Sequence, residues 1–195
     1  MRKGLQQGVT LTELLIGLTI LGILAGVGAP SFSNVIKNSR QGSTFNNIIG
    51  TLHLARSEAI KRNTGVAVCA RLTDTQCGPD WSNGWLLFVD DGATPNSLEP
   101  GEEVLRIGEP LGNNLLVTAI GSSLATASAY IVRTNIRFTP RGSSSWRGGG
   151  SITLCDDRGD QSMKAMFVSI SGDIRRARKD PNGIVSTPWG TDLQC

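Results

Sequence analysis

The first thirty residues constrain the fold of this chain more than any other segment. Arg2 and Lys3 give the chain a short basic leader, which ends at Gly8, and an apolar run follows at once over residues 9–29. An apolar stretch of roughly 20 residues is long enough to cross a bilayer as a helix. We therefore expect residues 1–8 to form a separate leader and residues 9–29 to form a transmembrane helix.

The position of the candidate cleavage site distinguishes this segment from a secretory signal peptide. A secretory signal is cut at small residues that follow its apolar core, whereas the candidate cut here, between Gly8 and Val9, lies before the core. Cleavage there would remove the basic leader and keep the apolar helix in the mature protein. The basic leader places the N-terminus in the cytoplasm, so the rest of the chain is expected outside it.

A single charged residue, Glu13, interrupts the apolar segment. A carboxylate inside a membrane helix costs about 2.5–3.5 kcal/mol on insertion scales, so it needs a partner or a function. Cleavage after Gly8 would create a free amine on Val9, four residues before Glu13. The alternative interpretation is a plain signal anchor with a glutamate near one membrane interface.

Gly8, the spacing from Gly8 to Glu13, and the later Pro30 together resemble the prepilin signal of type IV pilins and type II secretion pseudopilins. The resemblance implies that a prepilin peptidase cleaves after Gly8 and methylates the amine of Val9. It also implies that Glu13 meets the N-terminal amine of a neighbouring subunit during assembly, and that Pro30 is associated with local unwinding in filaments. Most members of the family have Phe where this chain has Val9, and we expect processing to tolerate the difference.

We expect the helix to continue as an amphipathic stretch over residues 30–63. Gly65 offers a left-handed C-cap after it, whereas Gly26, Gly28 and Pro30 are expected to weaken the helix, because proline lacks the amide donor. Apolar residues in steps of three and four define one stripe of this helix: Phe45, Ile48, Ile49, Leu52, Ala55 and Ala59.

Beyond Gly65 the spacing of apolar residues changes from helical to strand-like. Turns rich in Gly, Asp and Pro separate eight strand-like segments, at residues 66–69, 85–89, 103–107, 115–117, 130–132, 135–138, 152–155 and 166–170. The sequence therefore predicts a pilin-like α+β fold. A long N-terminal transmembrane helix would pack its outer half on an antiparallel β domain formed by residues 64–195.

The β domain contains all four cysteines of the chain, Cys69, Cys77, Cys155 and Cys195. An even number of cysteines in an oxidising compartment suggests two disulfides, and three pairings are possible. We favour Cys69 with Cys77, which would staple a short loop, and Cys155 with Cys195, which would tie the last residues to the sheet. A metal site is the competing interpretation. The chain has no Cys-x-x-Cys and only one histidine, so we expect neither a metal nor a cofactor.

Three stretches resemble the FimT/FimU/GspH group of minor pilins and pseudopilins. They are the L-x-x-A-R-S-E-A-I helix end in residues 52–62, the F-x-P-x-G turn in residues 136–142, and the closing strands at 152–155 and 168–172. The resemblance implies a low-abundance subunit near the tip of a type IV pilus, helping to initiate or cap its assembly, which we favour. The alternative is the corresponding pseudopilin of a type II secretion system.

The same resemblance implies a location and a set of partners. The protein would be a single-pass protein of the bacterial inner membrane with its β domain in the periplasm, incorporated into a pilus or pseudopilus. Its partners would be other pilins or pseudopilins, the prepilin peptidase and membrane lipid. Gly-x-Ser-x-Gly, Gly-x-x-x-x-Gly-Lys and His-Glu-x-x-His motifs do not occur in the sequence, so we expect no catalytic residues and no enzymatic activity.

The charges of the β domain are divided along the sequence. Residues 63–132 carry a net charge of −6, and residues 133–179 carry a net charge of +6. Some members of the FimT group bind DNA through a Gly-Arg-x-Arg motif, and the matching stretch here is residues 172–175, in which Asp173 replaces the first arginine.

A basic cluster follows Asp173, on what we expect to be a mobile loop. The candidate DNA-binding residues are Arg175, Arg176, Arg178 and Lys179, with Arg141 and Arg147 contributed from elsewhere in the sequence and Arg137 expected nearby. Trp146 is expected to be able to stack nearby. Such cations would bind double-stranded DNA through its phosphates and without sequence preference. The alternative is a solvated basic strand end that pairs with acidic groups on a neighbouring pilin.

Overall fold

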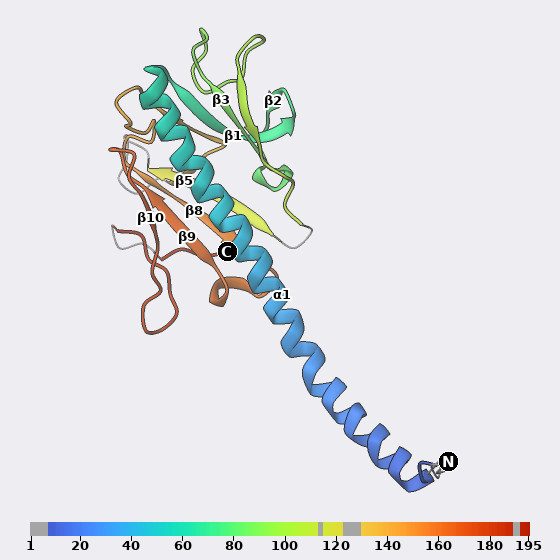
Figure 1. Cartoon of the computed structure of the whole chain (residues 1–195). Coiled ribbons are helices and arrows are strands. Elements are labelled where there is room, and N and C mark those ends of the chain that lie inside the picture. Colours follow the sequence, from blue (N-terminus) through green and yellow to red (C-terminus); the bar gives the residue numbers. More distant parts are fainter. Residues whose placement is uncertain (1–7, 113–114, 123–129, 189–191) are drawn as a thin grey trace. The chain divides into compact units, whose positions relative to one another are not determined.

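We describe the protein from a computed structural model that covers residues 8–112, 115–122, 130–188 and 192–195 (Figure 1). The chain divides into two compact units, residues 1–42 and residues 43–195. One long helix, α1 (Leu11–Arg62), contributes to both units. Two short 3-10 helices, η1 (Trp81–Asn83) and η2 (Gly159–Gln161), lie in the second unit.

The start of α1 has the sequence of a capping box. Thr10 precedes the first helical residue, and its Oγ1 accepts a hydrogen bond of 3.3 Å from the backbone N–H of Glu13. A Thr followed three residues later by Glu is the spacing that satisfies free N–H groups at a helix N-terminus. Glu13 lies in the first turn, where the helix macrodipole stabilises a negative charge. Glu13 therefore has a local role at the start of α1.

The apolar side chains of α1 are exposed in the first unit. The large apolar residues between Val9 and Leu24 are 53–75% exposed. The sequence predicts a transmembrane segment over residues 9–29. Among the residues that the structure describes, no helix is both long and apolar enough to span a membrane. The helix runs through Pro30 without a break, although the sequence predicts a weakened helix there.

The end of α1 is capped by Asn63 and not, as the sequence predicts, by Gly65. Asn63 has a φ of +53°, and the following N–H, of Thr64, donates to the carbonyl of Ala59 at 3.3 Å. Asparagine tolerates this left-handed conformation and can close a helix in place of glycine. Gly65 lies beside Arg137 instead: a Cβ at this position would lie 2.1 Å from the Arg137 guanidinium, which would have to move.

Two antiparallel sheets of five strands each form the β part of the second unit. The first sheet has the order β2-β1-β3-β4, with β7 also paired to β1: β1 (Val66–Thr73), β2 (Gln76–Cys77), β3 (Trp85–Val89), β4 (Val104–Ile107) and β7 (Asn135–Phe138). The second sheet has the order β10-β9-β8-β5-β6: β5 (Leu116–Ser122), β6 (Tyr130–Val132), β8 (Gly150–Cys155), β9 (Lys164–Val168) and β10 (Ile174–Arg176).

The part of α1 in the second unit packs its apolar stripe against both sheets (Figure 1). Phe45, Ile48, Leu52, Ala55 and Ala59 share one buried cluster with residues of β1, β3 and β7 from the first sheet and of β5, β8, β9 and β10 from the second. These strand residues alternate along each strand, because successive side chains point to opposite faces. The predicted fold, a long helix packed on an antiparallel β domain, is confirmed.

Each disulfide lies on a sheet face that points away from α1. Cys69 is bonded to Cys77 and Cys155 to Cys195, with Cα–Cα distances of 5.7 and 5.6 Å. These are the pairs that the sequence favours. Cys69 belongs to a small apolar cluster on the first sheet, and Cys155 to another on the second sheet.

Candidate functional site

The three stretches that carry the family resemblance meet at Arg56. This α1 residue donates from Nε to the carbonyl of Gly142 and from Nη2 to the carbonyl of Ser171, each at 3.1 Å. Gly142 ends the F-x-P-x-G turn, and Ser171 lies in the turn between β9 and β10. A single guanidinium therefore fixes two turns of the β domain to the helix.

The turn after β9 has no room for a side chain at Gly172. This residue has a φ of +75°, a conformation that favours glycine. A Cβ at this position would lie 1.9 Å from the carbonyl oxygen of Gly142. The two turns are thus packed backbone against backbone beside Arg56. This contact fixes the start of β10, the strand that carries part of the basic cluster.

The basic cluster is not a mobile loop at Arg175 and Arg176. Both residues lie in β10, which pairs with β9 so that Arg175 is opposite Phe167 and Arg176 is opposite Met166. The prediction of a mobile loop is wrong for these two residues, because pairing with β9 orders them as a strand. The alternative interpretation, a basic strand end, describes this backbone. Charged side chains are common on edge strands, where they discourage further pairing.

Arg176 points to the face that packs on α1. Its guanidinium lies 5.9 Å from the centre of the Phe45 ring, and its Nη2 donates to Oδ1 of Asn46 at 2.9 Å. Met166, opposite Arg176, belongs to the main core. Arg176 therefore contributes to the seam between helix and sheet.

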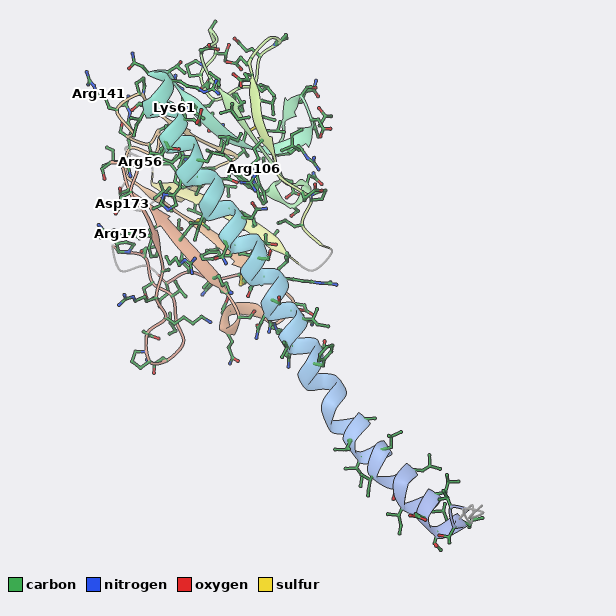
Figure 2. All side chains as sticks on the ribbon, in the orientation of Figure 1. Arg56, Lys61, Arg106, Arg141, Asp173 and Arg175 are labelled. Atoms are coloured by element: carbon green, nitrogen blue, oxygen red, sulfur yellow. A yellow bond between two sulfur atoms is a disulfide. The ribbon has the colours of Figure 1, made fainter. Side chains whose placement is uncertain are left out.

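Arg175 points to the opposite face and is 80% exposed. Its Nε donates to the carboxylate of Asp173, the residue that replaces the first arginine of the Gly-Arg-x-Arg motif. Arg175 and Arg147 both line a hollow of about 430 Å³ whose walls include Phe167 and Ser171. Figure 2 shows Arg175 next to Asp173, on the side of the second unit that also carries Arg56 and Arg141.

The other candidate cations are placed differently. Arg141, Arg147 and Arg178 are all exposed. Lys179 is exposed, and its Nζ donates to the backbone carbonyl of Gln161. The structure thus brings Arg147 and Arg175 together at one hollow, and it directs Arg176 away from them.

Trp146 is not available for stacking on a ligand. It is 2% exposed, and its Nε1 donates to the carbonyl of Asn135 at 2.9 Å. The ring belongs to the main core. The expectation that Trp146 could stack is therefore wrong, because the turn after β7 folds the ring inward.

A buried ion pair that the sequence does not reveal joins the acidic and basic parts of the domain. The Asp90 side chain is fully buried and accepts a hydrogen bond from Nε of Arg137. It also accepts from the backbone N–H of Asn96 at 3.1 Å.

Within the described residues, no group of three or more His, Cys, Asp or Glu side chains is placed to hold a metal ion.

Two further acids stabilise the loop after Asp90. Glu99 accepts from the backbone N–H groups of Ala93 and Thr94, and Glu102 accepts from those of Gly92 and Glu99. The Thr94 side chain and the Ala93 amide lower the pKa of Glu99. Part of the acidic charge that the sequence places in residues 63–132 is therefore engaged within the loop itself.

Two family models match the chain, one at its N-terminus and one over most of the second unit. Residues 3–29 match the prokaryotic N-terminal methylation motif, and residues 44–173 match the family described as Type II transport protein GspH. The first match contains Gly8, Val9 and Glu13. The second contains the three stretches that meet at Arg56, including Gly142 and Ser171.

Two curated proteins are similar in sequence. The chain is 30% identical over 133 residues to the type IV major fimbrial protein FimA of Dichelobacter nodosus. The aligned region covers 63% of this chain and 77% of that protein. It is 36% identical over 98 residues to the pilin-like protein PilA1 of Thermus thermophilus, which covers 50% of this chain and 56% of that protein.

A solved structure has the same fold. The type IV minor pilin FimU of Pseudomonas aeruginosa superposes with a TM-score of 0.50 and 17% identity, over 75% of this chain and 97% of that one. A second crystal form of FimU gives the same TM-score and identity. The family match over residues 44–173, the methylation motif and the shared fold agree. The chain belongs to the GspH family of type IV minor pilins and pseudopilins.

Proposed function

We propose that this protein is a minor pilin that helps to initiate or cap the assembly of a type IV pilus. One observation carries the proposal: a single chain combines the N-terminal methylation motif with a GspH domain. The FimU-like fold is consistent with it. Its role is structural and not catalytic. The alternative is a minor pseudopilin of a type II secretion system, which the description of the GspH family favours.

The N-terminal segment would act in three steps. A prepilin peptidase cleaves after Gly8 and methylates the new amine of Val9. Residues 9–29 hold the subunit in the inner membrane, with the β domain in the periplasm, and the exposed apolar side chains of α1 supply the lipid contacts. During assembly the Glu13 carboxylate then pairs with the N-terminal amine of a neighbouring subunit, so its charge is compensated in the apolar filament core. Pro30 allows local adjustment of the helix.

A deletion strain separates the pilus from the secretion system. Loss of surface pili, with normal release of exoproteins, is expected if the protein is a minor pilin. The chain expressed from a plasmid should restore the pili, whereas its Glu13→Ala variant should not. Normal piliation with exoproteins retained in the periplasm would reject the pilus proposal in favour of the pseudopilin.

Non-specific DNA binding is a second candidate function. The observation that favours it is the pair Arg147 and Arg175 at one hollow, with Arg141 and Arg178 also reachable from solvent. Asp173 opposes it, because its carboxylate both pairs with Arg175 and repels phosphate. Several such cations would give binding that weakens steeply with salt.

A salt-titrated shift of double-stranded DNA by the full chain in detergent tests this candidate. The Arg147→Ala/Arg175→Ala double variant should lower the slope of log K against log salt by about 2, because each phosphate contact contributes about 0.9. Arg176→Ala is the matched control, because Arg176 lies on the same strand and is also exposed, but it contacts α1 and does not line the hollow. The DNA proposal fails if the full chain gives no shift at low salt, or if Arg176→Ala weakens the shift as much as the double variant.

A further inference from the structure

The two disulfides have different surroundings. Cys69 is fully buried, and it packs with Ala67, Leu86 and Phe88 on the first sheet. Cys195 is exposed, and its partner Cys155 is 4% exposed. Both Cys155 and Cys195 border a hollow of about 730 Å³. Cys77, the partner of Cys69, is partly exposed. Thiol–disulfide exchange requires a thiolate to reach a sulfur atom, so the disulfide with the exposed Cys195 is the more accessible of the two.

The hollow beside Cys195 has an apolar rim. The apolar side chains that line it are Pro110, Leu111, Leu115 and Leu116. Leu116 is 50% exposed and lies opposite Cys155 in the pairing of β5 with β8. Exposed apolar side chains around a hollow are typical of protein interaction sites. An accessible disulfide inside such a rim fits a protein dithiol better than a small thiol, because the rim can hold the partner while exchange occurs.

The accessible disulfide holds the last described residues in place. Val185 and Leu193 lie on the outer face of the second sheet, in a small apolar cluster that also contains Cys155. Polar contacts add to this: the N–H of Cys195 donates to Oδ1 of Asp160 at 2.7 Å, and Lys179 donates to Gln161. The strands of both sheets pair without this segment, so opening the disulfide loosens the segment and leaves the sheets intact.

We propose that Cys155–Cys195 is an exchangeable disulfide. A protein dithiol that docks on the apolar rim opens it, and the disulfide form of the same partner closes it again by the reverse steps. The state of Cys155–Cys195 determines how firmly the segment after β10 covers the second sheet. A thiolate of the dithiol attacks Sγ of Cys195 to form a mixed disulfide, and Cys155 leaves as a thiolate and takes up a proton. The second thiol of the dithiol attacks its own half of the mixed disulfide, and the Cys195 sulfur leaves as a thiol. Two electrons pass to the chain, and the dithiol becomes a disulfide. This device operates equally in a minor pilin and in a pseudopilin.

The order in which the disulfides open tests the proposal directly. The oxidised full chain, in detergent and without denaturant, is treated with a thioredoxin-type protein dithiol and quenched with an alkylating reagent at intervals. The four cysteines fall on separate tryptic peptides, at residues 63–71, 72–106, 148–158 and 180–195. Cys155 and Cys195 should be alkylated roughly tenfold or more faster than the other pair, because local opening costs less free energy than global unfolding.

Hydrogen exchange measures what the disulfide controls. After selective reduction, amide exchange should rise over residues 180–195 and stay unchanged over residues 63–106. The proposal is overturned if both disulfides open at the same rate, if Cys69–Cys77 opens first, or if the reduced chain exchanges over residues 180–195 as slowly as the oxidised chain. The wild-type chain suffices for these measurements, so a variant that fails to fold does not obscure them.

The rim has a matched control. Leu116→Ser should slow reduction by the protein dithiol several-fold and leave reduction by dithiothreitol unchanged. Leu72→Ser should change neither rate, because Leu72 is equally an exposed leucine, at 56%, but is not among the residues lining this hollow. A Leu116→Ser chain that the protein dithiol reduces at the wild-type rate would reject the rim as its docking surface.

Discussion

Gly172 joins two turns of the β domain so closely that its lack of a side chain determines their packing. Its φ of +75° places it in the left-handed region, and the carbonyl of Gly142 occupies the place of a Cβ. Gly159 has a similar φ of +71°, but no atom lies within 4 Å of its Cβ position. A side chain at Gly159 would meet only the strain of a positive φ, whereas one at Gly172 would also collide with Gly142.

Substitution of these glycines by alanine should have unequal effects. Gly159→Ala is expected to cost about 1 kcal/mol, the usual penalty for a left-handed alanine. Gly172→Ala is expected to cost at least about 3 kcal/mol, because the backbone of one turn must move as well. Urea unfolding of the two variants and the wild type measures both values. Equal losses would show that the contact with Gly142 does not constrain the turn.

Asp156 makes stability depend on pH. The Arg158 guanidinium is the largest influence and, with the Ser162 hydroxyl and against desolvation, lowers the pKa of this carboxyl from 3.8 to about 2. A lowered pKa in the folded state gives stability that is present above pH 3.8 and is lost as the pH falls toward 2.

An Asp156→Asn variant should reveal this dependence. At pH 7 it should be less stable than the wild type by about 2 kcal/mol, since one pKa unit corresponds to about 1.4 kcal/mol. The difference should shrink between about pH 4 and about pH 2, because the wild-type carboxyl also becomes neutral there. Denaturant midpoints of both chains across this range provide the measurement. A difference that persists at the acid end of the range would assign the loss to packing and not to charge.

At the scale of the element, β10 shows how strand alternation assigns roles to neighbouring residues. Arg175 and Arg176 are adjacent, chemically identical and both exposed. Arg175 pairs with Asp173, whereas Arg176 contacts Phe45 and Asn46 of α1. The sequence does not distinguish them, because Ile174 is the single apolar residue of this strand and one residue is too few to show an alternating pattern. Pairing with β9 makes the distinction.

The two arginines should differ in their contribution to stability. Arg176→Ala should lower the free energy of unfolding by about 0.5–1 kcal/mol, through loss of the contact with Phe45. Arg175→Ala should leave it unchanged, because an exposed ion pair contributes little. Thermal unfolding of the two variants side by side is the measurement. A larger loss in Arg175→Ala would mean that its pair with Asp173 stabilises the turn before β10.

Helix and strand patterns can be read from the sequence to different degrees. The stripe from Phe45 to Ala59 predicts the buried face of α1, because helical periodicity survives in a long element. The strand β3 is predicted with its observed limits, since residues 85–89 are all apolar. By contrast, β2 is not among the predicted strands, and β10 enters only through the alternative interpretation of the basic cluster as a strand end. They are two and three residues long, and only their partner strands define them.

At the scale of the whole molecule, folding reduces the charge difference between residues 63–132 and residues 133–179, because some of these charges are engaged inside the fold. Asp90 is paired with Arg137, and Glu99 and Glu102 are engaged by backbone amides of their own loop. These contacts could not be predicted, because they join segments whose proximity only the tertiary fold creates. The meeting of three stretches at Arg56 is of the same kind.

The mass of the mature N-terminal peptide is the most direct test of whether the chain is a prepilin-type subunit. We predict that protein from cells with an active prepilin peptidase begins at Val9 and carries one methyl group on its amine. In cells that lack the peptidase, residues 1–8 should remain. A mature chain that still contains residues 1–8 in peptidase-positive cells, or that is cut after the apolar segment, would contradict the account.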